Sequence, residues 1–298
     1  MKFNLLNVYA LFSLALVGSH AVNPEVYWKS VLPNSPMPKA IKDLLYTTEE
    51  KNTKAISVAK RHAGVQAFRN YRSSADQLMY DPNEVLFFME NDLHQGTEMN
   101  LYFMKADQKE SFLPRQVADS IPFSSNKLTQ IYNKFSIKSN SLEAKDVKQT
   151  LTECESKGNE GEEKYCATSL ESMIDFSTEQ LGKKVKAIST DVNTKESTTL
   201  QKYTVEGAKK FVADKAVVCH KQNYVYAVFY CHKTINVRAY VVSLVGVDGT
   251  KAKAVAICHT DTAKWNPKHL AFQVLKVKPG SVPVCHFLPE DNVVWVPY

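Results

Sequence analysis

The sequence predicts an α+β protein in which an antiparallel β core is stapled by disulfides and flanked by helices. Three observations lead to this prediction. The C-terminal third consists of strand-like apolar runs separated by turn residues. Two stretches ahead of it repeat apolar residues at helical spacing. Six cysteines, an even number, lie between residues 154 and 285.

The chain begins with the pattern of a secretory signal peptide. Lys2 precedes an almost wholly apolar run over residues 5–18, and Ser19 and Ala21 place small residues where a signal peptidase reads them. We therefore assign residues 1–21 as a signal peptide. Because a membrane span needs about 20 apolar residues, this run is too short to be an anchor. We expect an exported, soluble protein without a membrane contact.

Residues 22–84 are expected to form a partly disordered, propeptide-like arm. Prolines at positions 24, 33, 36 and 38 surround Trp28 and argue against regular structure, apart from a short helix over Ala40–Tyr46. Residues 47–84 are polar and weakly periodic. The globular domain is therefore expected over residues 85–298.

The first half of that domain shows two strands and two helices. Apolar runs predict strands over Val85–Met89 and Leu101–Met104. Residues Leu128, Ile131, Tyr132 and Phe135 mark one helix by their spacing. The second helix is predicted to begin at a capping box of Thr168 and Glu171, to bury Leu170, Met173, Ile174 and Leu181, and to stop at Gly182.

The second half is rich in predicted strands. Tyr224–Tyr230 is aromatic and β-branched. Two strands, Ala239–Val247 and Lys251–Ile257, flank Asp248-Gly249, which predicts a hairpin. Asn266 and Pro267 resemble an N-cap and first-turn proline, so a helix is expected from there towards Leu275. Val293–Val296 forms the last predicted strand.

Composition argues for a soluble globular protein and against a nucleic-acid binder. Hydrophobic residues make up 44% and charged residues 23% of the chain. The net charge is +6, and the basic residues are scattered singly or in pairs such as Lys183-Lys184. A solvated surface explains this pattern better than a nucleic-acid patch.

The cysteines are predicted to be oxidised. Export to an oxidising compartment favours three disulfides over free thiols or metal thiolates. The sequence leaves the pairing open. The six residues are Cys154, Cys166, Cys219, Cys231, Cys258 and Cys285.

Four of these cysteines are followed directly by histidine, and this series carries the candidate chemistry. The pairs are Cys219-His220, Cys231-His232, Cys258-His259 and Cys285-His286. They are separated by 10, 25 and 25 residues, and they use half of the 8 histidines in the chain.

Each pair follows a strand-like run, and neighbouring side chains of a strand point to opposite faces. The series therefore predicts disulfides on one face and converging imidazoles on the other. Imidazole is a good Cu²⁺ ligand, and the Irving–Williams order favours copper. The spacing does not fit a Cys/His zinc finger. The alternative is that the histidines are ordinary strand residues with satisfied hydrogen bonds.

The same residues resemble the plant BURP-domain family. Its pattern of an early Phe-Phe, two further cysteines and four Cys-His pairs is matched by Phe87-Phe88, by Cys154 and Cys166, and by the four pairs. Residues 214–225, 258–265 and 281–297 are also similar to the family. The resemblance covers residues 85–298. Within the family the chain is similar to the seed-protein and dehydration-responsive subgroups, although the arm lacks the repeats of the latter.

The resemblance implies a fold and offers two functions. Some family members are copper-dependent peptide cyclases that crosslink a core peptide in their own chain, with dioxygen as oxidant. In that case His220, His232, His259 and His286 are the copper ligands, and we expect two copper ions. Other members are secreted seed or stress-responsive proteins without shown activity. For either function we expect a secreted protein that is located in the apoplast, the cell wall or the vacuole. We also expect a monomer.

A cyclase needs a core peptide with a crosslinkable aromatic residue. Two arm segments qualify because each ends in tyrosine: Phe68-Arg69-Asn70-Tyr71 and Gln77-Leu78-Met79-Tyr80. Asp81 suits proteolytic release, so the expected partners are the chain's own arm and processing proteases. The alternative is that both tyrosines are ordinary linker residues. Indole crosslinking is not expected, since no tryptophan lies between Trp28 and Trp265.

Three further residues are weaker candidates for the metal site. Asp261 follows His259 by two positions and is expected either to orient an imidazole or to be a solvated surface residue. His94 and His269 are possible extra ligands, with capping or surface roles as the alternative.

Overall fold

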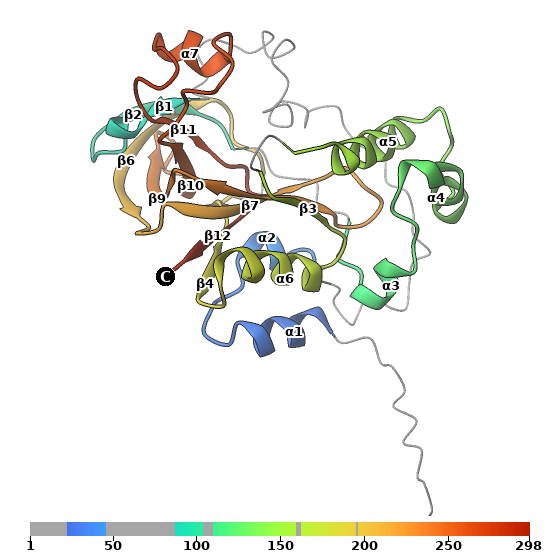
Figure 1. Cartoon of the computed structure of the whole chain (residues 1–298). Coiled ribbons are helices and arrows are strands. Elements are labelled where there is room, and N and C mark those ends of the chain that lie inside the picture. The colour runs from blue at the N-terminus through green and yellow to red at the C-terminus, as the bar shows by residue number, and fades with distance from the viewer. Residues whose placement is uncertain (1–22, 46–86, 104–109, 159–161, 195) are drawn as a thin grey trace, which may run out of the picture.

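The computed structural model describes residues 23–45, 87–103, 110–158, 162–194 and 196–298 (Figure 1). The predicted signal peptide, both candidate core segments and the start of the Val85–Met89 strand lie outside these residues. Within them the protein consists of two antiparallel sheets and flanking helices. The predicted α+β class with an antiparallel, disulfide-containing core is confirmed.

One sheet has seven strands in the order β1-β11-β10-β9-β6-β2, with β5 paired to β10. Its strands are β1 (Phe88–Met89), β2 (Glu98–Leu101), β5 (Asp191–Val192), β6 (Gln201–Lys210), β9 (Val237–Gly246), β10 (Lys251–His259) and β11 (Val284–Phe287). The predicted hairpin is β9–β10, and its turn includes Gly249 at φ 85°. Gly249 suits that turn because a side chain is disfavoured at positive φ.

The other sheet has five strands in the order β3-β8-β7-β12-β4. Its strands are β3 (Lys164–Ala167), β4 (Val185–Ile188), β7 (Lys215–Lys221), β8 (Phe229–Ile235) and β12 (Val293–Pro297). The chain thus crosses from the first sheet to the second between β11 and β12. This crossing places residues 288–292 beside both sheets.

The helices cover the sheets from outside. They are α1 (Pro24–Val31), α2 (Lys39–Lys42), α3 (Arg115–Asp119), α4 (Leu128–Phe135), α5 (Leu142–Glu155), α6 (Leu170–Leu181) and α7 (Leu270–Leu275), with short 3₁₀ turns η4 (Glu90–Asp92) and η5 (Ser125–Lys127). Figure 1 shows α1 beside α6 below the five-stranded sheet, and α7 at the opposite end above β11.

Strand alternation divides the core into layers. On β7, Val217 and Cys219 join the outer core under α6, whereas Ala216 and Val218 join the layer between the sheets. β10 repeats this pattern, with Ala256 and Cys258 outward and Val255 and Ile257 inward. A residue's position in its strand therefore decides which of these layers it faces.

Four expectations about local structure need correction. Residues 24–31 form a helix, because Asn23 caps it and Pro24 occupies its first turn, where a missing N–H costs nothing. Tyr224–Val228 is not a strand. Its buried side chains pack against α4 and α5 instead. Ser169, one residue after the predicted Thr168, caps α6 together with Ser172. His269 caps α7, so that helix begins at Leu270 rather than after Asn266.

Other elements lie where the sequence predicts them or close to that position. α4 and the last strand β12 lie where the apolar patterns predict them. The strand expected over Leu101–Met104 lies earlier, at Glu98–Leu101, because Phe103 leaves the ladder to bond Thr198. No described helix combines the length and the apolar character that crossing a bilayer requires.

Candidate metal centre

Two disulfides hold together the strands that carry the Cys-His pairs. Cys219 of β7 lies directly opposite Cys231 of β8, and the two are bonded. Cys258 of β10 lies directly opposite Cys285 of β11 and is bonded to it. In both cases the Cα atoms are 3.9 Å apart. Each disulfide thereby brings two of the four Cys-His pairs side by side.

The third disulfide lies outside the strand pairs of the histidines. Cys154 at the end of α5 is bonded to Cys166 of β3, with 5.7 Å between Cα atoms. All described cysteines are therefore oxidised, as the sequence predicts.

The cysteines and histidines face opposite sides of their strands. Cys219 and Cys231 lie in the outer core under α6, and Cys258 and Cys285 lie in the outer core of the seven-stranded sheet. The neighbouring histidines face the other way. His232 is in register with Val218, and His286 with Ile257, two residues of the layer between the sheets. All four imidazoles therefore face the layer between the sheets.

His220 and His232 form the first imidazole pair. Their rings are stacked with centroids 5.4 Å apart and an interplanar angle of 16°. The two Nε2 atoms face each other at 3.3 Å. Both side chains are half-buried.

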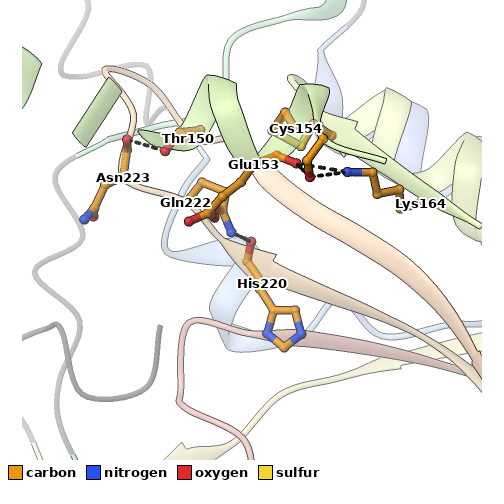
Figure 2. The surroundings of a disulfide bond; sticks show 9 residues. Thr150, Glu153, Cys154, Lys164, His220, Gln222 and Asn223 are labelled. Carbon is orange, nitrogen blue, oxygen red and sulfur yellow. Dashed lines mark hydrogen bonds between the residues drawn. A yellow bond between two sulfur atoms is a disulfide. The ribbon is translucent and has the colours of Figure 1, made fainter. Parts of the chain in front are cut away.

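The outer nitrogens of this pair have their own partners. Nδ1 of His232 lies 3.2 Å from a carboxylate oxygen of Glu162, to which it donates. Nδ1 of His220 lies 2.9 Å from the side-chain amide of Asn292. In the loop after β7, the Gln222 amide donates to the His220 carbonyl, and Figure 2 shows the imidazole pointing away from this loop. Such partners fix ring orientation and tautomer.

With the side-chain amide of Asn292 oriented as in the structure, one arrangement of protons satisfies all three hydrogen bonds of the first pair without a metal. Asn292 donates to Nδ1 of His220, Nε2 of His220 donates to Nε2 of His232, and Nδ1 of His232 donates to Glu162. Because an amide's oxygen and nitrogen exchange places by a flip, Asn292 can also accept from Nδ1 of His220. Both Nε2 atoms then carry a lone pair towards the same point.

His259 and His286 form the second pair. Their rings are stacked with centroids 5.6 Å apart and an interplanar angle of 12°. Nδ1 of His286 lies 3.2 Å from the carbonyl of Phe287 and must donate to it. In that tautomer the lone pair of His286 is on Nε2.

Burial keeps the second pair neutral near neutral pH. It lowers the pKa of His286 to about 4, helped by the neighbouring His269 and His232 and opposed by the Phe287 carbonyl. Burial, together with His286, His232 and His269, holds the pKa of His259 well below its ordinary value. Because His232 acts on both rings, the two pairs are close enough to interact electrostatically. Neutral imidazole is the form that binds metals.

Aromatic residues wall the second pair. Trp265 meets His259 edge-on, with ring centroids 5.0 Å apart, and lies 4.9 Å from His269. Phe87 lies 5.6 Å from His269 and 6.4 Å from His286. The first described residue after the arm is therefore in contact with the histidine cluster.

The weaker candidates have other roles. Nδ1 of His269 accepts the Ala271 N–H at 3.2 Å and caps α7, so in the neutral ring Nε2 carries the proton. His94 is exposed and bonds within its own turn, to Gln95 and Thr97. Asp261 is exposed and accepts from Ala263 N–H, so its expected role as a partner of an imidazole gains no support. Glu162 and Asn292 take that role instead.

Across the described part of the chain, no three or more His, Cys, Asp or Glu side chains form a ready metal-binding group. The imidazoles meet as two pairs. Sequence reasoning missed Glu162, Asn292 and Trp265, although Trp265 and Asn292 lie within stretches similar to the BURP pattern.

Comparison with known proteins settles the family. The BURP domain model matches residues 86–297. The chain belongs to the BURP-domain family. The matched residues include both sheets, the three disulfides and all four Cys-His pairs.

Several plant BURP proteins are similar to this one. BURP domain protein RD22 of Arabidopsis thaliana is 54% identical over 235 residues, which cover 77% of this chain and 60% of the relative. BURP domain-containing protein 3 of Oryza sativa subsp. japonica is 54% identical over 240 residues, which cover 78% of this chain and 56% of the relative. BURP domain-containing protein 5 of the same species is 48% identical over 287 residues, which cover 93% of this chain and 88% of the relative. The chain thus spans little more than half the length of the first two relatives.

Proposed function

We propose that this BURP protein is a secreted, copper-dependent peptide cyclase that oxidatively crosslinks a tyrosine of its own N-terminal arm. The observation that carries the proposal is that four imidazoles form two close pairs, His220 with His232 and His259 with His286, on strand faces turned towards the layer between the sheets. Two disulfides hold the pairs in register, and burial keeps the second pair in the metal-binding form.

The donor set fits copper. The thiols are consumed in disulfides, which leaves imidazole nitrogen as the available ligand type, and copper binds imidazole well. Two imidazole nitrogens bound to one ion at about 2.0 Å stand roughly 3 Å apart when their bonds meet near a right or tetrahedral angle. The 3.3 Å between Nε2 of His220 and of His232 agrees with this spacing. We expect one ion at each pair, hence two in total.

The chain's own residues supply positioning, and copper with dioxygen would supply the oxidising power. Glu162 and Asn292 orient the first pair, and Phe287 orients His286. Crosslinking Tyr71 or Tyr80 to a nearby carbon removes two hydrogen atoms, and dioxygen takes up the corresponding two electrons and two protons. Processing proteases would then release the product.

The path of the chain supports action on its own arm. Phe87 touches the second histidine pair through His286. Tyr80 lies seven residues before Phe87 in the sequence. A stretch of that length spans at most about 25 Å, so chain length allows this tyrosine to reach the cluster.

The test combines copper binding with the mass of the arm. Purified protein is loaded with Cu²⁺ in air, and the peptides covering residues 60–84 are followed by mass spectrometry. We expect these peptides to lose the mass of two hydrogen atoms, and the loss to disappear without oxygen or copper. The double variant Tyr71→Phe/Tyr80→Phe is expected to bind copper normally and to keep its mass.

An unchanged arm mass in copper-loaded, aerated protein would remove the cyclase and leave the copper site standing. Failure of the protein to bind copper would remove both.

The second candidate is a non-catalytic secreted seed or stress-responsive protein. It is favoured by the hydrogen-bonded arrangement of Asn292, His220, His232 and Glu162, which satisfies these side chains without a metal. This candidate predicts an intact arm in protein taken from tissue, and no chemical consequence of Tyr71→Phe or Tyr80→Phe.

A further inference from the structure

The described N-terminal segment, residues 23–45, is part of the folded domain. α1 begins at Asn23, whose side chain accepts from the Glu25 N–H, and only Trp28 of this helix is buried. After α1, the chain buries Leu32, Ile41 and Leu44 in the outer core under α6. The segment therefore contributes to the same core as the five-stranded sheet.

Trp28 anchors the segment. Its side chain is 2% exposed, and its ring centroid lies 5.5 Å from that of Trp295 on β12. The indole Nε1 donates to the Ser35 carbonyl at 2.9 Å, so its polar atom is satisfied inside the core. Trp295 is itself fully buried, and removal of the segment would uncover it. Burying a large aromatic side chain in this way gives a strong apolar contribution.

A polar contact fixes α1 to α6. The Tyr27 hydroxyl donates to one oxygen of Asp175 at 2.5 Å, and Arg115 donates to the other at 2.6 Å. The Arg115 guanidinium also lies 5.3 Å from the centre of the Tyr27 ring. Asp175 thus joins α1 to α3 through α6.

Hydrogen bonds to backbone carbonyls fix the rest of the segment. The Ser35 hydroxyl donates to the Val185 carbonyl of β4 at 2.6 Å in a buried position. The Phe112 N–H donates to the Leu44 carbonyl at 2.8 Å, one residue before the last described position of the segment. Residues 23–45 contain no cysteine, so all of these contacts are non-covalent.

From these contacts we infer that residues 23–45 stay bound to the domain when the chain is cut between positions 46 and 86, so that a processed protein is a non-covalent two-chain complex. The occupant of the surface formed by α6, β4 and Trp295 is thus the protein's own N-terminal segment, before and after cleavage. The inference needs neither copper nor catalysis, and it concerns the face of the five-stranded sheet opposite to the one that carries His220 and His232.

The experiment cuts the chain without touching the described contacts. A recognition sequence for a sequence-specific protease is inserted after Lys60, the folded protein is cleaved, and the products are separated by gel filtration in native buffer. We expect the fragment that contains residues 23–45 to elute with the domain. It should separate only in denaturant.

Two variants on α1 form a matched pair. Trp28→Ala is expected to raise the dissociation constant of the fragment at least about a hundredfold, because it removes a large buried side chain. Val26→Ala changes an apolar side chain on the same helix that is 57% exposed, and it should alter the constant by less than about twofold.

Should Trp28→Ala prevent folding before cleavage, Tyr27→Phe replaces it. This variant keeps the ring and loses the bond to Asp175, for which we expect about a tenfold weaker complex. Release of the wild-type fragment in native buffer would overturn the inference, as would equal retention of the Trp28→Ala and Val26→Ala fragments.

Discussion

At the scale of single residues, the partners of the outer nitrogens decide what the imidazoles can bind. Glu162 can only accept, so it fixes the proton of His232 on Nδ1 and leaves Nε2 to face His220. Asn292 can donate to Nδ1 of His220 or accept from it. Asn292 is 7% exposed and directly precedes β12, so its position is set by the crossing between the two sheets.

Replacing Asn292 therefore tests whether the first pair binds copper. We expect Asn292→Leu to lower copper affinity by about 10- to 100-fold, because the Nδ1 proton of His220 loses its acceptor. Asn292→Asp keeps an acceptor and should bind copper nearly as wild type does. Calorimetric titration with Cu²⁺ measures both. Equal affinities of the two variants would show that Asn292 does not position a ligand.

At the scale of elements, strand alternation separates the two residue types of each Cys-His pair. β7 and β8 turn their cysteines into the outer core, and this turns their histidines towards the second sheet. β10 and β11 turn their cysteines into the outer core of the seven-stranded sheet and their histidines towards the five-stranded sheet. A one-residue slip of either strand pair would exchange the faces, so the disulfides protect the register on which the imidazole pairs depend.

Two of the three disulfides allow a controlled test of this role. Cys219–Cys231 and Cys154–Cys166 close loops of equal sequence separation, 12 residues. Replacing either pair by serine should lower the free energy of unfolding by about 3 kcal/mol, as measured by denaturant titration of the metal-free protein.

Copper binding should distinguish the two serine variants. Loss of Cys219–Cys231 removes the staple between His220 and His232 and is expected to weaken copper binding more than loss of Cys154–Cys166, which keeps both staples between histidine strands and loosens only the loop that carries Glu162. Equal weakening by both variants would attribute the effect to general loss of stability rather than to register.

At the scale of the whole molecule, residues 46–86 are joined at both ends to segments that contact the folded domain. Leu44 accepts from Phe112 at one end, and Phe87 contacts His269 and His286 at the other. Under the proposed function, a peptide joined to the domain in this way would meet the histidines as an intramolecular partner, at an effective concentration set by the chain rather than by the solution.

Crosslinking should therefore be a first-order process. We expect a tenfold dilution of copper-loaded protein to leave the half-time of the arm's mass loss unchanged, as followed by quenched samples in the mass spectrometer. Mixing the His259→Ala/His286→Ala variant with the Tyr71→Phe/Tyr80→Phe variant should leave the intact arm of the first uncrosslinked. A half-time that lengthens with dilution would indicate action between molecules.

Much of the candidate site was predictable because it depends on local chemistry. Adjacent Cys and His on a strand must face opposite sides, so the separation of sulfurs from imidazoles follows from the sequence alone. The helix of Leu128–Phe135 and the hairpin at Asp248-Gly249 were predictable for the same reason, since their periodicity and turn residues lie close together in the chain. Tyr224–Val228 shows the limit of such patterns, because packing against α4 and α5 overrides its strand propensity.

The sequence by itself determined that four histidines oppose four of the six cysteines and that the domain has a BURP pattern. Only the tertiary structure decided that Cys219 pairs with Cys231 and Cys258 with Cys285, that Asn292 and Glu162 reach the first imidazole pair, and that residues 23–45 fold onto Trp295. The physical reason is the separation along the chain of the residues that interact. Strand alternation is fixed between neighbours, whereas these contacts join positions at least 12 residues apart in the chain and depend on register and packing across both sheets.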